Sequence, residues 1–110
     1  MDQTLTITES GAEGGASRTF HLKGPLLISN LFDFQSKVRS CQAQNLVLDL
    51  TGVPYMDSAG VGVIIGAYVT RERDKRGLLL VGVNDRVRAL LHVTQVERLF
   101  QFADKLPESA

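Results

Sequence analysis

The sequence of 110 residues predicts a single α/β domain, with helices packed on a mixed sheet of four to five strands. Two short segments near the N-terminus alternate polar and apolar residues, as half-buried strands do. Further along, two apolar runs flank a segment with helical periodicity, which is the pattern of a strand–helix–strand crossover. A chain of this length buries about two-thirds of its unfolded surface, which is enough for one core.

The two alternating segments are residues 4–8 and 18–23. The link between them, residues 9–17, holds three glycines and predicts a flexible connection. Two alternating strands joined by a short polar link favour an antiparallel pair. Gly24 and Pro25 then end the second strand, because proline cannot continue the ladder of hydrogen bonds.

A first helix is predicted to start at an N-cap formed by Ser29 or Asn30 and to reach about Ser40. Its buried stripe consists of Leu31, Phe34, Val38 and Cys41. Because Cys41 lies on this stripe, we interpret it as a small core residue. As the one cysteine, it cannot form an internal disulfide.

The apolar runs at residues 46–50 and 78–83 predict strands that are covered on both faces. Residues 51–55 form a turn, and a helix follows from Asp57 or Ser58. Because a helix connects the two runs, we expect the strands to be parallel.

That connecting helix is predicted to run to about Arg76, with Gly77 as its C-terminal cap. Its buried stripe consists of Val61, Ile64, Ile65 and Tyr68. Its last turns, residues 71–76, mix charges of both signs with a basic excess, which is typical of a solvated helix C-terminus.

A third helix is predicted to begin at Asn84 or Asp85 and to bury Val87, Leu90 and Leu91. A last short strand is expected at residues 99–102. The domain is assigned to residues 1–110, with residues 1–3 and 104–110 expected to be poorly ordered.

Composition excludes several classes of protein. Hydrophobic residues make up 44% of the chain and charged residues 22%, which excludes wholesale disorder. Twelve basic residues balance twelve acidic ones, so bare nucleic acid is not an expected partner. His21 and His92 have no neighbours at metal-ligand spacing, so no metal or other cofactor is expected. We expect a cytoplasmic protein without membrane insertion, because no apolar stretch is long enough to span a bilayer.

Residues 55–62 stand where a buried strand gives way to a helix, the edge at which open α/β sheets place function. A phosphate-binding loop is disfavoured, because position 65 is isoleucine where a Gly-x-Gly-x-x-Gly motif needs glycine. A catalytic serine is equally disfavoured, because Met56 replaces the first glycine of a nucleophile elbow. Neither histidine belongs to a recognisable triad pattern for Ser58.

The simplest interpretation of Asp57 and Ser58 is an ordinary helix N-terminus. It leaves the glycines unexplained, since each glycine inside a helix costs about 1 kcal/mol relative to alanine. Gly62 and Gly66 share one helix face, which suits close packing against a neighbour. Gly60, in the first turn, is predicted to leave the surface around Ser58 flat and open to a partner.

One unbroken run, residues 49–62, contains a strand, a turn and Asp57-Ser58-Ala59-Gly60-Val61-Gly62. This run resembles the Asp-Ser-(Ser/Thr/Ala)-Gly-hydrophobic-Gly signature of STAS domains, the fold of bacterial anti-sigma factor antagonists. Residues 79–82, 87–91 and 96–100 also follow the pattern of that family. The likeness covers residues 45–102, and the first forty residues contribute little to it.

The resemblance implies a binding module without catalysis of its own. In that family an anti-sigma factor serine kinase phosphorylates the motif serine, and the unphosphorylated antagonist binds the kinase and releases the sigma factor. Ser58 would then be the phosphoacceptor, and a serine phosphatase would act on its phosphorylated form. The implied partner-binding residues are Asp57, Ala59, Gly60, Val61, Gly24 and Pro25.

The sequence departs from the family after the second predicted strand. Many relatives carry a Gly-Glu-hydrophobic-Asp run there, whereas this chain has Gly24-Pro25-Leu26-Leu27. A second hypothesis keeps the same fold but makes the chain a stand-alone STAS subunit that regulates a lipid or anion transport ATPase. Such subunits need no phosphoacceptor, so the intact Asp57-Ser58 pair favours the first hypothesis.

Overall fold

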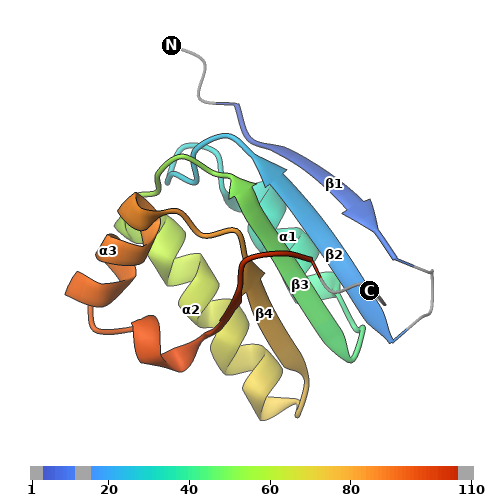
Figure 1. Ribbon diagram of the computed structural model, residues 1–110. Coiled ribbons are helices and arrows are strands. Elements are labelled where there is room, and N and C mark those ends of the chain that lie inside the picture. Colours follow the sequence, from blue (N-terminus) through green and yellow to red (C-terminus); the bar gives the residue numbers. More distant parts are fainter. Residues whose placement is uncertain (1–3, 12–15, 107–110) are drawn as a thin grey trace.

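A five-stranded sheet forms the centre of the protein in the computed structural model, which describes residues 4–11 and 16–106 (Figure 1). The elements are β1 (Thr6–Ser10), β2 (Ser17–Lys23), α1 (Phe32–Ser40), β3 (Asn45–Gly52), α2 (Ser58–Arg73), β4 (Gly77–Val81), α3 (Asp85–Val93), a 3-10 turn (Glu97–Leu99) and β5 (Gln101–Ala103). This order confirms the predicted α/β class and its mixed sheet. Most of the termini predicted to be poorly ordered, and the middle of the predicted flexible link, lie outside the described residues.

The strands lie in the order β1-β2-β3-β4-β5. β1 pairs with β2 antiparallel, and each later pair is parallel, as predicted for the crossover between β3 and β4. Because α1, α2 and α3 each connect two parallel neighbours, the carboxyl ends of β2, β3 and β4 share one edge of the sheet. The loops after β2 and β3 run together along that edge, at the top of Figure 1.

One face of the sheet packs against all three helices. The strands contribute Phe20, Leu22, Leu46, Leu48, Leu50 and Leu80, and the helices contribute Phe34, Val38, Val61, Ile64, Ala67, Val87 and Leu91. Burying one such side chain contributes about 1.5–3 kcal/mol. The stripe predicted for α1 therefore lies in or against the core, with Cys41 half-buried beside it.

The expected start of α1 is wrong. The helix begins at Phe32, and its N-cap residue, Leu31, makes no side-chain cap. Asn30 instead closes the preceding loop, where its Oδ1 accepts the N–H of Leu27 and its Nδ2 donates to the carbonyl of Pro25. The side chain of Asn30 therefore stabilises the loop before α1 and does not cap the helix.

The expected end of α2 is also wrong. The helix ends at Arg73, and Lys75 takes the left-handed conformation (φ 58°) that was expected of a glycine cap. Gly77 opens β4, where it pairs with Asn45. Arg71, predicted to be on a solvated face, is only 3% exposed. Its guanidinium donates to the backbone carbonyls of Gly77, Cys41 and Ala43.

Candidate functional site

Asp57 and Ser58 stand at the first turn of α2, directly after the turn that follows β3. Asp57 is the N-cap residue, and its Oδ1 accepts the backbone N–H of Gly60 at 3.0 Å. Ser58 is the first residue of the helix and is exposed. The predicted helix N-terminus is therefore confirmed, and it leaves the Ser58 hydroxyl open to a partner.

Asp57 also joins two loops. Its second carboxylate oxygen, Oδ2, accepts the N–H of Ile28 at 3.0 Å, and its own N–H donates to the carbonyl of Leu26 at 3.2 Å. The same loop donates the N–H of Leu26 to the carbonyl of Tyr55 at 3.2 Å. The loop after β2 is therefore held against the start of α2.

The structure gives Gly60 a different role from the one expected. Gly60 is buried, and a Cβ built on it would lie 2.6 Å from the carbonyl oxygen of Leu26. Its missing side chain admits the neighbouring loop and does not flatten the surface. Val61 is 4% exposed and belongs to the core. Neither residue can therefore contact a partner directly in this conformation, and both support the surface from beneath.

The remaining predicted contact residues also include both accessible and buried positions. Ala59 and Asp57 are half-buried beside the exposed Ser58. Pro25 is buried. Gly24 has φ 115°, and its N–H donates to the carbonyl of Gly52 at 3.0 Å. A Cβ at Gly24 would lie 2.2 Å from the carbonyl oxygen of Thr4, so this glycine is required by the turn.

Two helix glycines provide a matched test of this packing. We expect Gly60→Ala to destabilise the fold, by about 1–3 kcal/mol for an overpacked site, because the new methyl group collides with Leu26. Gly62 and Gly66, by contrast, are exposed and meet nothing within 4 Å of a built Cβ, so their predicted close packing is wrong. Gly62→Ala should stabilise the fold by up to about 1 kcal/mol, through helix propensity. Urea unfolding of both variants checks this, and equal effects would contradict it.

Asp57 is held as a carboxylate. Partial burial opposes its charge, but the backbone N–H groups of Ile28, Gly60 and Ala59 outweigh that effect and lower its pKa below the ordinary value of 3.8. A folded-state pKa below the unfolded value stabilises the fold at neutral pH. That contribution is lost as the pH falls below the unfolded value.

We therefore expect Asp57→Asn to cost about 1 kcal/mol at pH 7, because one amide cannot accept both backbone N–H groups. The cost should shrink as the pH falls below about 4, where the carboxylate is protonated first in the unfolded parent and, at still lower pH, in the folded one. Glu9, Asp49 and Glu97 also have lowered pKa values, so the difference between variant and parent is the quantity that isolates Asp57. Thermal unfolding at pH 7 and pH 3 measures it; a difference independent of pH would refute the assignment.

Two large exposed apolar side chains, one on the loop bonded to Asp57 and one at the start of α1, were missed in the sequence. Ile28 is 60% exposed, and its backbone is bonded to Asp57. Phe32, the first residue of α1, is 67% exposed. Phe32 lies outside the buried stripe predicted for its helix, and this position in the sequence could have indicated that its side chain is exposed. We call Ser58, Ala59 and Ile28 the docking surface.

The described residues offer little to support other chemistry at Ser58. Both histidines hydrogen-bond elsewhere, His92 with Glu97 and His21 with Ser10 and Asp49. Within residues 4–11 and 16–106, no three His, Cys, Asp or Glu side chains gather closely enough to hold a metal ion. Among the described helices, none is long and apolar enough to cross a bilayer.

Known proteins resemble this chain in both sequence and fold. The family model described as "STAS domain" matches residues 11–109. The anti-sigma-B factor antagonist of Listeria monocytogenes is 38% identical over 56 residues, which cover 51% of this chain and 49% of that protein. The chain thus spans about half the length of the first curated relatives it matches.

Two solved proteins share the fold. An anti-sigma factor antagonist from Mycobacterium paratuberculosis superposes with a TM-score of 0.79 at 17% identity, covering 93% of this chain and 87% of that one. The anti-sigma factor antagonist SpoIIAA in its unphosphorylated form superposes with a TM-score of 0.74 at 15% identity, covering 91% of this chain and 90% of that one. The phosphorylated form of SpoIIAA from Bacillus superposes with a TM-score of 0.71 at 14% identity, covering 91% of this chain and 93% of that one. At these identities the superpositions establish a common fold.

Proposed function

Because the chain belongs to the STAS domain family, we propose that it is an anti-sigma factor antagonist controlled by phosphorylation of Ser58. In its unphosphorylated form it binds an anti-sigma factor serine kinase and releases a sigma factor. Phosphorylation by that kinase ends the interaction, and a serine phosphatase restores it. Anti-sigma factor antagonists are regulatory binding proteins and not enzymes, so the ATP belongs to the kinase.

The observation that carries the proposal is the exposed Ser58 hydroxyl on a rigid helix N-terminus. Asp57 fixes that turn through both carboxylate oxygens. A phosphate on Ser58 would sit at the positive end of the α2 dipole, which favours an anion by about 0.3–1 kcal/mol. The fold therefore tolerates the modification, while a docked partner would meet a new dianion beside Asp57.

The docking surface supplies the apolar part of the contact. Ile28 is exposed on the loop that is hydrogen-bonded to Asp57, and Phe32 is exposed at the start of the helix that follows this loop. Exposed large apolar groups are typical of protein–protein contacts. The loop after β2 lacks the acidic residues that many relatives have there, and it presents Ile28 instead. We infer that the partner's complementary surface is more apolar than basic at this point.

Incubation with a purified anti-sigma factor serine kinase from the same genome and ATP tests the proposal. Phosphate mapped to Ser58 by mass spectrometry, and absent in Ser58→Ala, is the expected result. The phosphatase should then remove it. A chain that binds a lipid or anion transport ATPase and is not phosphorylated by any such kinase would favour the second hypothesis instead.

A further inference from the structure

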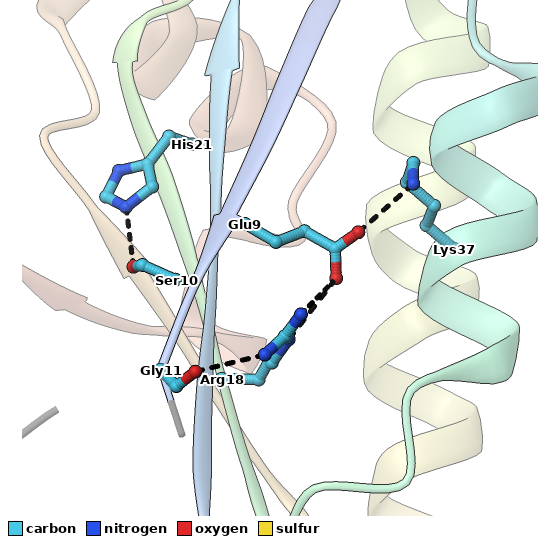
Figure 2. Close-up of polar contacts among 6 residues, drawn as sticks. All are labelled: Glu9, Ser10, Gly11, Arg18, His21 and Lys37. Atoms are coloured by element: carbon cyan, nitrogen blue, oxygen red, sulfur yellow. Dashed lines mark hydrogen bonds and ion pairs between the residues drawn. The ribbon is translucent and has the colours of Figure 1, made fainter. Parts of the chain in front are cut away.

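Three side chains on neighbouring strands form a hydrogen-bonded chain that the proposed function does not use. The Ser10 hydroxyl of β1 lies 2.9 Å from Nε2 of His21 on β2. On the other side of the ring, Nδ1 lies 2.8 Å from Oδ2 of Asp49 on β3. The strand register explains the contact, since His21 pairs directly with Asp49. Figure 2 shows Ser10 and His21 on the side of the strands opposite to Lys37 of α1.

The positions of the protons follow from Asp49. Partial burial opposes its charge, but hydrogen bonds from Thr51 and His21 lower its pKa. At neutral pH it is therefore a carboxylate, which can only accept. Thr51 donates both its hydroxyl (2.6 Å) and its N–H (3.1 Å) to Oδ1, which leaves Oδ2 for His21. Nδ1 of His21 must then be the donor to Oδ2. In the tautomer with its proton on Nδ1, Nε2 has a lone pair that accepts from the Ser10 hydroxyl.

The arrangement has the parts of an activated serine. A nucleophile lies within hydrogen-bond reach of a base, and a third group orients that base. The side chain of Asp49 is 17% exposed and that of His21 is 31% exposed, whereas Ser10 is an exposed residue. The orienting carboxylate is thus the most sheltered member and the hydroxyl the most accessible. Ser10 pairs with Thr19, near the start of β2, so it lies towards the sheet edge opposite to Ser58.

We propose that Ser10 is a nucleophile activated by His21 and Asp49, and that it accepts acyl groups from small activated acyl donors such as acyl phosphates and aryl esters. The Ser10 oxygen forms a bond to the acyl carbon, and the bond from that carbon to the leaving oxygen breaks. His21 Nε2 takes the Ser10 proton and then delivers it to the leaving group or to solvent. The product is an ester on Ser10, one per chain, and no redox step is involved.

The exposure of Ser10 bears on which acyl donors can react with it. Ser10 and its neighbours lie on an accessible sheet face, so small donors with good leaving groups should react first. The chemistry depends on β1, β2 and β3 alone, and it can succeed or fail independently of phosphorylation at Ser58.

p-Nitrophenyl acetate is the probe that tests this. We expect release of one equivalent of p-nitrophenolate per reactive chain and an acetyl group on Ser10 in peptide mapping. The exposed Ser36 of α1 serves as a control within the same molecule. General-base assistance typically contributes about 10²–10⁴-fold, so Ser10 should be acetylated at least about a hundredfold faster than Ser36.

Variants of His21 and Asp49 show whether Ser10 reacts because it is activated or only because it is exposed. His21→Gln retains hydrogen-bonding capacity but removes the base, and it should lower the Ser10 rate about a hundredfold. Asp49→Asn should lower it as well, because the amide favours the wrong tautomer of His21. Circular dichroism confirms that each variant folds. Equal acetylation of Ser10 and Ser36, or an unchanged rate in a folded His21→Gln variant, would overturn the proposal.

Discussion

Phosphorylation of Ser58 is expected to weaken binding to the anti-sigma factor by roughly a thousandfold, or about 4 kcal/mol, without lowering the melting temperature of the free chain. The phosphate adds about −1.5 to −2 charges at one exposed point of a chain whose formal net charge is zero. In the complex, that charge lies beside the carboxylate of Asp57 and must lose its water. In the free protein it faces solvent at a helix N-terminus, where it is tolerated.

Ser58→Asp should act in the same direction with a smaller effect, because it adds a single charge. Ser58→Ala should bind like the parent, since a methyl group at an exposed helix position removes no described contact. Gln101→Glu provides the matched control: it adds one negative charge at an exposed residue of β5. Calorimetric titration and thermal unfolding measure the two effects separately. A Ser58→Asp variant that unfolded at a markedly lower temperature would show that Ser58 has a structural role.

Arg71→Ala should be the most destabilising change among the charged residues, at about 3 kcal/mol or more. Arg71 is 3% exposed, and its guanidinium is hydrogen-bonded to three backbone carbonyls. A carbonyl that loses its donor away from water costs about 1–3 kcal/mol, and these three acceptors are partly buried. Two of those carbonyls, from Cys41 and Ala43, precede β3, and the third belongs to Gly77 at the start of β4. The residue therefore holds the entrances of two neighbouring parallel strands against the last turn of α2.

Arg71→Lys should recover little of this stability, because one ammonium cannot reach three carbonyls in the geometry that a planar guanidinium provides. Arg73→Ala is the control, since its side chain is 72% exposed, and we expect an effect within about 0.5 kcal/mol. Urea unfolding provides the comparison. If Arg71→Ala and Arg73→Ala were equally stable, the hydrogen bonds of Arg71 would contribute nothing beyond those of a surface residue.

Local patterns in the sequence were enough to predict the fold class and most of the helices and strands. Alternation over residues 4–8 and 18–23, and the apolar runs at 46–50 and 78–83, predicted the strands and their directions. Helical periodicity placed α2 within a few residues of its observed bounds. These patterns are local, because side chains repeat every 2 residues in a strand and every 3.6 in a helix. The run at residues 57–62 carries the resemblance to STAS domains, which makes Ser58 the proposed phosphoacceptor.

The roles of several of those residues depend on contacts between distant parts of the chain. Gly60 was expected to open the surface, yet it admits the carbonyl of Leu26. Arg71 belonged to a charged segment and is nevertheless buried. His21 was assigned no function, and it joins Ser10 to Asp49 across three strands. The partners in these contacts are distant in sequence, and no local periodicity encodes which side chains meet when strands pair and loops approach.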